Sequence, residues 1–174
     1  HWDGQTFSTQ QVIEKPNKMH GSASDDIYAV GWHGAIAHWN GNQWQNITPP
    51  DGIPAGATFT GVRVINRDTV YICSSQGPLL VGNARDGFTD IGSPEYRWYG
   101  IGYFQNRIFL AGGPKGVFEL IDGKIVSIKD NVRAVGVWET KDAVYFIPDE
   151  QKPNAWVARY IPGDDKPWKK LGTL

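Results

Sequence analysis

Few side chains in this sequence have the types and spacing that catalysis requires. The four histidines, His1, His20, His33 and His38, lack the spacing of a zinc site. The chain contains neither the Gly-x-Ser-x-Gly pattern of a serine hydrolase nor a phosphate-binding glycine loop. The sequence therefore predicts no catalytic residue, no metal site and no cofactor.

The acidic residues raise one enzymatic alternative, the hydrolysis of glycosides. Such an enzyme needs two carboxyl groups that face each other across the substrate. Asp25, Asp26, Asp68 and Asp142 instead lie in short polar stretches between apolar segments. Because Asp and Asn bond to the backbone nearby in such stretches, we expect these residues to stabilise turns.

The elements that would position any site are indicated by an internal repeat. The segment His1-Trp2-Asp3-Gly4 is matched by His38-Trp39-Asn40-Gly41, 37 positions later. A repeat of this size is typical of β-propellers, in which each blade is a four-stranded sheet. Apolar segments recur at a similar spacing of 43, 38 and 36 positions, at 27–30, 70–73, 108–111 and 144–147. Each follows a polar turn and precedes a break that contains glycine or proline.

These patterns predict an all-β fold, namely a β-propeller of four-stranded antiparallel blades with about four and a half blades present. Residues 1–174 would form a single partial propeller. Its predicted parts are the outer half of a blade at 1–12 and full blades at 19–48, 59–92, 97–129 and 132–172. Because open blade edges are unfavourable, we expect the missing inner strands to come from an upstream segment or from another chain. Residue 1 would then not be the biological start.

The composition makes several classes of partner unfavourable. The chain has 17 basic and 18 acidic residues, a net charge of −1 and no block of like charge. Nucleic acids and anionic membranes usually require a concentrated basic surface, so we expect neither as a partner. The single cysteine, Cys73, permits no disulfide within the chain, which fits a reducing compartment. These observations do not determine the compartment, and the cytoplasm is the one they favour.

One repeat unit resembles a known family. Residues 19–31 and 34–44 are similar to the bacterial propeller repeat of the BNR, YVTN and photosystem-assembly-factor-like group, and 1–12 match its half blade. In the second blade Arg85 replaces the aspartate of the family's Asp-box turn, while Gly87 and Thr89 fit it. The resemblance implies a propeller more firmly than an activity, because the group includes sialidases, other glycosidases, lectins, assembly factors and proteins similar to immunity partners of secreted toxins.

Recognition of a partner is the function class that remains. In a propeller, the loops between second and third strands share one face with the loops that join successive blades, and we call this the loop face. Trp, Tyr and Arg on such a face are the residues that contribute most to protein interfaces. The predicted binding residues are Trp32, His33, Gln76, Lys115, Glu150, Tyr96, Arg97 and Trp98.

The two tryptophans in this set differ in their alternatives. Trp32 lies in a turn between Gly31 and Gly34, where packing does not demand an indole. Trp98 has a second interpretation, in which it begins an inner strand and packs between blades. Trp32 is therefore the more direct candidate for binding.

The sequence thus predicts a non-enzymatic propeller of bacterial type that binds a protein, with neutralisation of a secreted toxin or effector as the favoured role. The alternative is a carbohydrate-binding, lectin-like propeller or a sialidase-like glycosidase. For a sialidase, Arg63, Arg97 and Arg133 lie near successive innermost strands, and a tyrosine nucleophile with a glutamate partner would also be needed. If the chain is not a sialidase, we expect these arginines to line a polar, solvated central channel.

Overall fold

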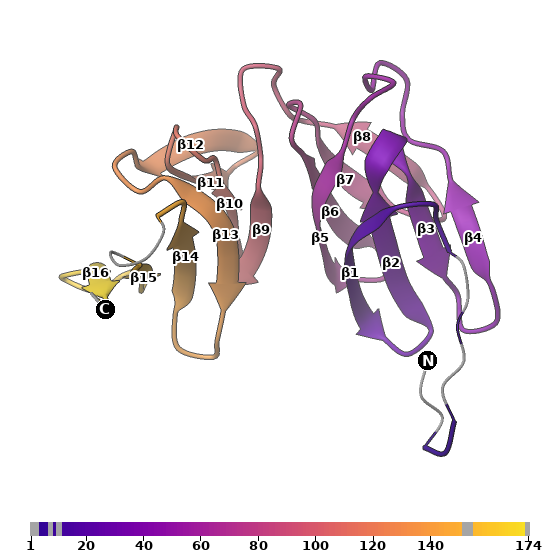
Figure 1. Cartoon of the computed structure of the whole chain (residues 1–174), viewed down its shortest axis with the longest axis horizontal. Coiled ribbons are helices and arrows are strands. Elements are labelled where there is room, and N and C mark those ends of the chain that lie inside the picture. Colours follow the sequence, from indigo (N-terminus) through magenta and orange to yellow (C-terminus); the bar gives the residue numbers. More distant parts are fainter. Residues whose placement is uncertain (1–3, 7–8, 10–11, 151–154, 173–174) are drawn as a thin grey trace.

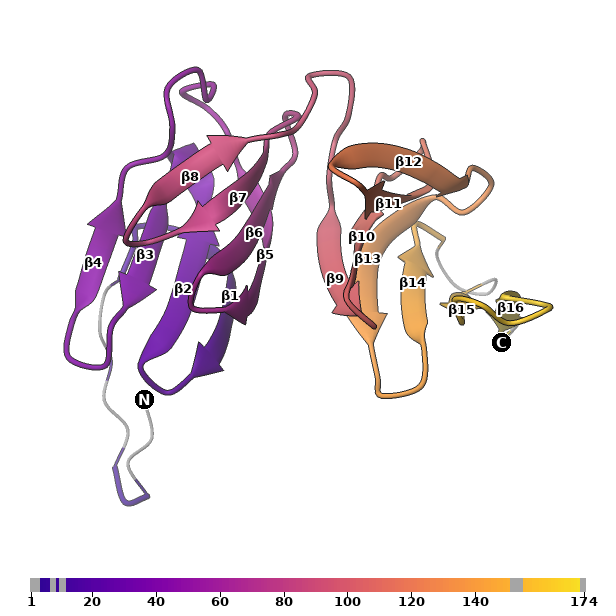
Figure 2. The same ribbon diagram turned by 180° about the vertical axis from the view of Figure 1, so that it is seen from behind.

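The computed structural model describes residues 4–6, 9, 12–150 and 155–172, and their strands form four antiparallel sheets (Figures 1 and 2). Each sheet contains four strands in sequence order, as a meander does. The prediction of an all-β propeller with four-stranded antiparallel blades is therefore confirmed. Most of the half blade predicted at 1–12 lies outside the described residues.

The four blades follow one another along the chain. The first contains β1 (Pro16–Ala23), β2 (Asp26–Gly31), β3 (Ile36–Trp39) and β4 (Trp44–Ile47), with the 3-10 turn η1 (Trp32–Gly34) between β2 and β3. The second contains β5 (Phe59–Asn66), β6 (Thr69–Ser74), β7 (Leu79–Asn83) and β8 (Gly87–Asp90). The third contains β9 (Gly100–Phe104), β10 (Arg107–Ala111), β11 (Val117–Ile121) and β12 (Lys124–Lys129). The fourth contains β13 (Ala134–Glu139), β14 (Val144–Pro148), β15 (Val157–Tyr160) and β16 (Trp168–Leu171).

Three of the four blades begin at positions other than those predicted, at Pro16, Gly100 and Ala134 in place of residues 19, 97 and 132. β1 starts at Pro16 and pairs there with Gly31, although Met19 was the predicted start. Its first residues are polar and exposed, so they carry no apolar signal. β9 starts at Gly100 and not at Arg97, because Trp98 donates its main-chain N–H to Ser74 of the second blade.

The blades pack in order through their first strands, β1 against β5, β5 against β9 and β9 against β13. In both views the first and fourth blades lie at opposite ends of the row (Figures 1 and 2). Because alternate side chains of a strand point to opposite faces, each inner blade contributes apolar residues to both neighbours. In the second blade, for example, Ile72 packs towards the first blade and Cys73 towards the third.

Glycines on the first strands allow this close packing. A Cβ atom at Gly61 of β5 would lie 2.9 Å from Cγ2 of Ile101 in β9. A Cβ atom at Gly102 of β9 would lie 2.5 Å from Cγ1 of Val137 in β13. Carbon atoms prefer separations of about 3.5–4.0 Å, so any larger residue at these positions would push neighbouring blades apart.

A histidine also links the first two blades. Nδ1 of His20 in β1 accepts a hydrogen bond from the main-chain N–H of Val64 in β5, at 3.1 Å. Burial of the imidazole, together with the nearby charge of Arg63, lowers the pKa of His20. The neutral ring is therefore the form that the contact between the blades requires.

Replacing Gly102 by alanine is expected to destabilise the fold. The added methyl group would overlap Val137, and overpacking of this kind typically costs about 1–3 kcal/mol. Gly56→Ala is the matched control, because a Cβ atom at Gly56 would meet nothing within 4 Å. Urea denaturation measures both free energies of unfolding, and equal values for the two variants would contradict the role given to Gly102.

Acidification is expected to weaken the contact between the first two blades. A histidine with a lowered folded pKa contributes stability that is complete above the unfolded value, about 6.5, and is lost as the pH falls through the folded value. His20→Asn keeps an acceptor for Val64 and removes the titrating group, so the unfolding free energy should fall less between about pH 7.5 and 5. His33→Asn, at an exposed position in η1, is the matched control. An unchanged pH dependence in His20→Asn would refute this assignment.

Candidate functional site

Main-chain hydrogen bonds join the connections of the loop face to one another. The N–H of Gly34, in the turn between β2 and β3, donates to the carbonyl of Ala57 at 2.7 Å. The N–H of Gly113, in the turn between β10 and β11, donates to the carbonyl of Ala134 at 2.7 Å. The loops therefore form one fixed surface over successive blades (Figure 1).

Trp32 is an exposed indole on this surface. The side chain is 47% exposed, and its Nε1 donates to Oδ1 of Asn17 at 3.2 Å. The ammonium of Lys15 lies 5.1 Å from the centre of the ring. His33 follows with a left-handed backbone (φ 55°) and is exposed. The indole is thus held in place while much of its surface faces solvent.

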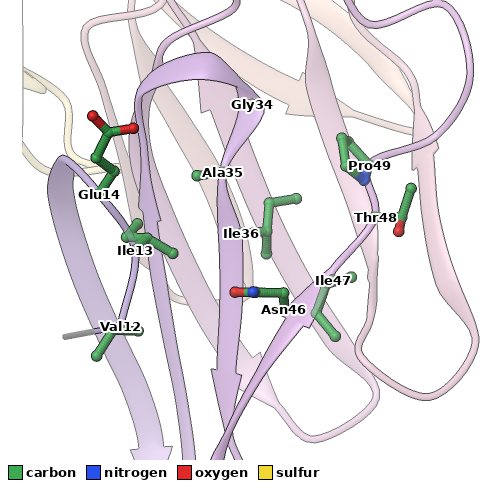
Figure 3. Close-up of a pocket in the computed structure, with 10 residues that line it drawn as sticks. All are labelled: Val12, Ile13, Glu14, Gly34, Ala35, Ile36, Asn46, Ile47, Thr48 and Pro49. Carbon is green, nitrogen blue, oxygen red and sulfur yellow. The ribbon is translucent and has the colours of Figure 1, made fainter. Parts of the chain in front are cut away.

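A mostly apolar groove adjoins η1 (Figure 3). It has a volume of about 690 Å³ and runs between the segment 12–14 and the ends of β3 and β4. Ile13, Ile36 and Ile47 supply apolar side chains, and Gly34 and Pro49 line it near the loop face. Its polar lining residues are Glu14, Asn46 and Thr48. Such a groove next to an exposed tryptophan can accept an apolar side chain of a partner.

Gln76 acts mainly on the loop itself. Its Oε1 accepts hydrogen bonds from the main-chain N–H of Thr58 and from the hydroxyl of Ser75, both at 2.8 Å. Its Nε2 donates to the carbonyl of Gly56 at 3.3 Å. These bonds fasten the long connection between β4 and β5, so the amide is engaged within the chain.

The prediction that Trp98 lies on the binding surface is wrong. Its side chain is fully buried, its Nε1 donates to the carbonyl of Gly77 at 3.1 Å, and its ring packs on Phe118. The alternative interpretation, in which Trp98 packs between blades, is correct. Burial of a large indole side chain stabilises the fold more than its exposure to solvent would.

Trp98 nevertheless supports the predicted residues around it. The ring of Tyr96 stacks on Trp98 at 4.8 Å between centroids, and the ammonium of Lys115 lies 4.9 Å from the ring of Tyr96. Arg97 is exposed between the two aromatic residues. The structure thus brings Tyr96, Arg97 and Lys115 together around a buried anchor.

Glu150 lies apart from these groups, at the end of the fourth blade. It is exposed, and its Oε2 accepts a hydrogen bond from Nε1 of Trp156 at 2.5 Å. The predicted binding residues therefore form separate groups on the first, third and fourth blades. A ligand that touches all of them must be extended, as a protein surface is.

The arginines of the sialidase alternative do not converge. Arg63 lies in β5 and forms an ion pair with Glu139 of β13, so its charge is neutralised within the chain. Arg97 and Arg133 are exposed in the connections before β9 and β13. They do not line the hollow that Arg63 faces.

That hollow lies among the first strands of the blades. It has a volume of about 590 Å³, and it is lined by residues of β1, β5, β9 and β13 together with Tyr99 and with Ile147 of β14. Burial raises the pKa of the Glu139 carboxyl, and pairing with Arg63 opposes this shift. The pair therefore joins the second blade to the fourth, past the third.

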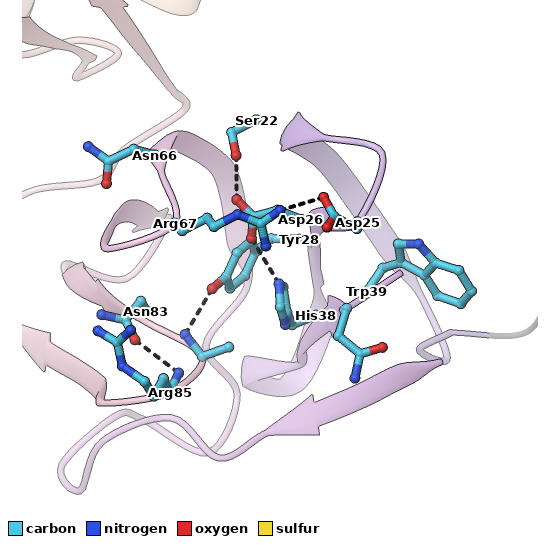
Figure 4. Close-up of polar contacts among 12 residues, drawn as sticks. Ser22, Asp25, Asp26, Tyr28, His38, Trp39, Asn66, Arg67, Asn83 and Arg85 are labelled. Carbon is cyan, nitrogen blue, oxygen red and sulfur yellow. Dashed lines mark hydrogen bonds and ion pairs between the residues drawn. The ribbon is translucent and has the colours of Figure 1, made fainter. Parts of the chain in front are cut away.

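A Ser, a His and an Asp also meet in the first blade, but not as a nucleophilic triad (Figure 4). The hydroxyl of Ser22 donates a hydrogen bond to Oδ2 of Asp26. Nε2 of His38 lies 2.9 Å from Oδ1 of the same carboxylate. In a triad the histidine must lie between the other two, so that it can take the serine proton. Asp26 is buried, so here the carboxylate ties β1, β2 and β3 together.

The ring of Tyr28 lies 4.5 Å from that of His38 and extends this cluster to the second blade. Its hydroxyl accepts a hydrogen bond from the N–H of Ala84 at 2.8 Å. The cluster is therefore a structural link. Sequence reasoning placed Asp26 only in a turn and missed this role.

Two further observations concern other site types. Among the described residues, no group of three or more His, Cys, Asp or Glu could hold a metal ion. The described part of the chain also contains no helix long and apolar enough to cross a membrane.

No protein-family model matches the chain. Over 62 residues it is 36% identical to the Immune protein Tsi7 of Pseudomonas aeruginosa. The match covers 36% of this chain and 19% of Tsi7, so the chain matches only about a fifth of the length of that relative.

Solved structures share the fold at low identity. The chain is similar to YCF48 bound to D1 peptide (TM-score 0.67, 13% identity), covering 90% of this chain and 54% of that one. It is similar to the computationally designed Ika4 protein (TM-score 0.67, 11% identity), covering 92% and 99%. It is also similar to BBS1N in complex with ARL6DN (TM-score 0.65, 14% identity), covering 99% and 60%. YCF48 and BBS1N are β-propellers, and the chain shares that fold.

Proposed function

We propose that this chain is a non-enzymatic propeller module of the BNR and YVTN-like type that binds a protein through its loop face. We further propose that the partner is a secreted toxin or effector, which the chain neutralises. Trp32 carries the first proposal: a large apolar side chain, 47% exposed, is fixed by Asn17 on a turn that does not need it for packing. Fixed, exposed tryptophans are typical of the centres of protein interfaces.

Other features of the surface support binding of an extended partner. The apolar groove beside η1 offers a place for a side chain of that partner. Tyr96 and Arg97, on a buried indole, offer a second contact region. Because the loops are tied by main-chain hydrogen bonds, little order has to be gained on binding, and this favours affinity.

The comparisons support the choice of partner. The relative with 36% identity over 62 residues is named an immune protein, and the structural neighbour YCF48 was solved with a bound peptide. An immunity protein acts by binding its toxin tightly, which needs a recognition surface and no catalytic group. The groups found on the loop face fit that requirement.

Binding can be tested with the protein encoded by the neighbouring gene, since immunity proteins and toxins are commonly encoded together. Isothermal titration calorimetry of the purified pair measures the affinity, and a glycan array tests the carbohydrate alternative. Tight binding to the neighbour's product, without glycan binding, supports the proposal. Glycan binding alone, or hydrolysis of a glycoside that one carboxylate substitution abolishes, overturns it.

Loop-face substitutions are expected to weaken this binding. Trp32→Ala or Arg97→Ala should cost about 2 kcal/mol or more in affinity if the residue lies at the centre of the interface. Asp142→Asn is the control, because it lies in the turn between β13 and β14 on the opposite face and should affect only stability. Calorimetry and thermal unfolding of each variant separate the two effects. Unchanged affinity in both loop-face variants would exclude this surface.

We also propose that a further blade covers the free face of the fourth blade, supplied by a segment outside residues 1–174 or by another chain. Trp138 and Ile147 are 68% and 46% exposed there, on the side opposite the residues that pack against the third blade. Met19, at the other end of the row, is 58% exposed. The chain spans only 54% of YCF48 and 60% of BBS1N, which leaves room for more blades in a complete ring.

The 174-residue chain alone is therefore expected to self-associate through this face. Burying one large apolar side chain contributes roughly 1.5–3 kcal/mol, so Trp138→Glu should shift the chain towards monomers. Val126→Glu, which changes another exposed apolar residue on an outer strand, is the control. Light scattering over a concentration series measures the mass, and a parent chain that is monomeric throughout would contradict the need for a cover.

A further inference from the structure

A third pocket opens at the outer rim, between the third and fourth blades. Its volume is about 360 Å³, and it lies among the end of β12, the connection that follows it, and β15 and β16. The lining residues are Lys129, Asn131, Val132, Trp156, Ala158, Trp168, Lys169 and Lys170.

The charges of this pocket are of one sign. Lys129, Lys169 and Lys170 line it, and no carboxylate is among the lining residues. Within the described part of the chain, none of these three ammonium groups forms an ion pair. The carboxylate of Glu150 accepts the N–H of Trp156 at the edge of the pocket and keeps its negative charge, so it offsets part of the positive charge of the lysines. Trp168 and Lys170 point to the same side of β16, and Lys169 between them points to the other side. Lys129 and Lys170 therefore supply two like charges at the pocket, and an anion bound there relieves their repulsion.

The aromatic residues restrict which anion fits. The ammonium of Lys129 lies 5.8 Å from the centre of the Trp168 ring, and that of Lys170 lies 4.6 Å from the centre of the Trp156 ring. Each lysine thus occupies an indole face that a sugar ring would need for stacking. The same contacts hold the two ammonium groups at the pocket, where carboxylates can pair with them.

We propose that this pocket binds carboxylate side chains of an acidic segment in a protein partner. The inference rests on the proposed function, because Asn131 and Glu150 connect the pocket to the loop face and make it the rim of the same surface. Rim charges of this kind select the partner and its orientation more than they raise affinity. The pocket therefore assigns a chemical property to the partner, namely acidic residues opposite the junction of the third and fourth blades.

A synthetic hexaglutamate peptide is the probe, with hexaglutamine as its uncharged counterpart and free glucuronate as the sugar arm. Calorimetry of the whole chain should show binding of hexaglutamate that weakens with salt and no binding of hexaglutamine. Lys129→Gln with Lys170→Gln should weaken hexaglutamate binding by about fivefold to tenfold, as expected for two partly exposed ion pairs. Lys124→Gln, at the opposite end of β12, is the matched control, and thermal unfolding confirms that each variant is folded.

Several results would overturn the inference. Equal weakening by Lys124→Gln would show attraction by overall charge, and lysine-dependent binding of glucuronate alone would assign the pocket to an acidic sugar. Absence of hexaglutamate binding would exclude a carboxylate site. With the neighbouring gene's product, full affinity in the double variant contradicts this inference and leaves the proposed function intact. If that product does not bind at all, the proposed function fails, and the hexaglutamate titration still decides whether the pocket takes carboxylates.

Discussion

Gly61 and Gly102 let the first strands of the second, third and fourth blades lie closer together than any larger residue would allow. That close approach determines the spacing of the apolar layers between the blades, since each layer must be filled by side chains from both sides. It also lets Arg63 reach Glu139 across the third blade. Burial disfavours the carboxylate of Glu139 and raises its pKa, and the guanidinium of Arg63 offsets part of that cost. Packing and the ion pair thus depend on the same glycine positions.

The spacing of the blades in turn fixes the loop face. Each of its turns is bonded to a neighbouring connection, as Gly34 is to Ala57 and Gly113 is to Ala134. Gln76 adds side-chain bonds to the long connection between β4 and β5, which joins the first blade to the second. A surface held in this way is already in one conformation before a partner arrives, which reduces the ordering cost of binding. The rigidity comes from the backbone, so the side chains of the loops are free to differ between related modules.

The parts of the fold that depend on neighbours in sequence could be predicted. Apolar segments bounded by turn residues indicate hairpins because the interactions involved are local. Trp98 was misplaced because its partners are distant in sequence: Gly77 lies in the turn between β6 and β7, and Phe118 lies in β11. The pair Arg63 and Glu139 and the lysine–indole pairs of the rim pocket bring together residues far apart in the chain. No local sequence pattern identifies the partner of either residue in such a pair, so these pairs are found only in the three-dimensional structure.

The distribution of charge explains how a chain with a net charge of −1 can still hold a basic pocket. On the face of the hairpin turns, Arg67 pairs with Asp25 at 2.6 Å, and Arg85 pairs with Asp86 at 2.7 Å, so these charges cancel locally. At the loop face, by contrast, lysines lie over aromatic rings, as Lys115 does over Tyr96 and Lys170 over Trp156. A ring attracts a cation without neutralising it, so those ammonium groups keep their full charge for a partner. Because only a few charges are involved and the chain as a whole is nearly neutral, they act over about a Debye length, roughly 8–10 Å, and discriminate between partners that are already close.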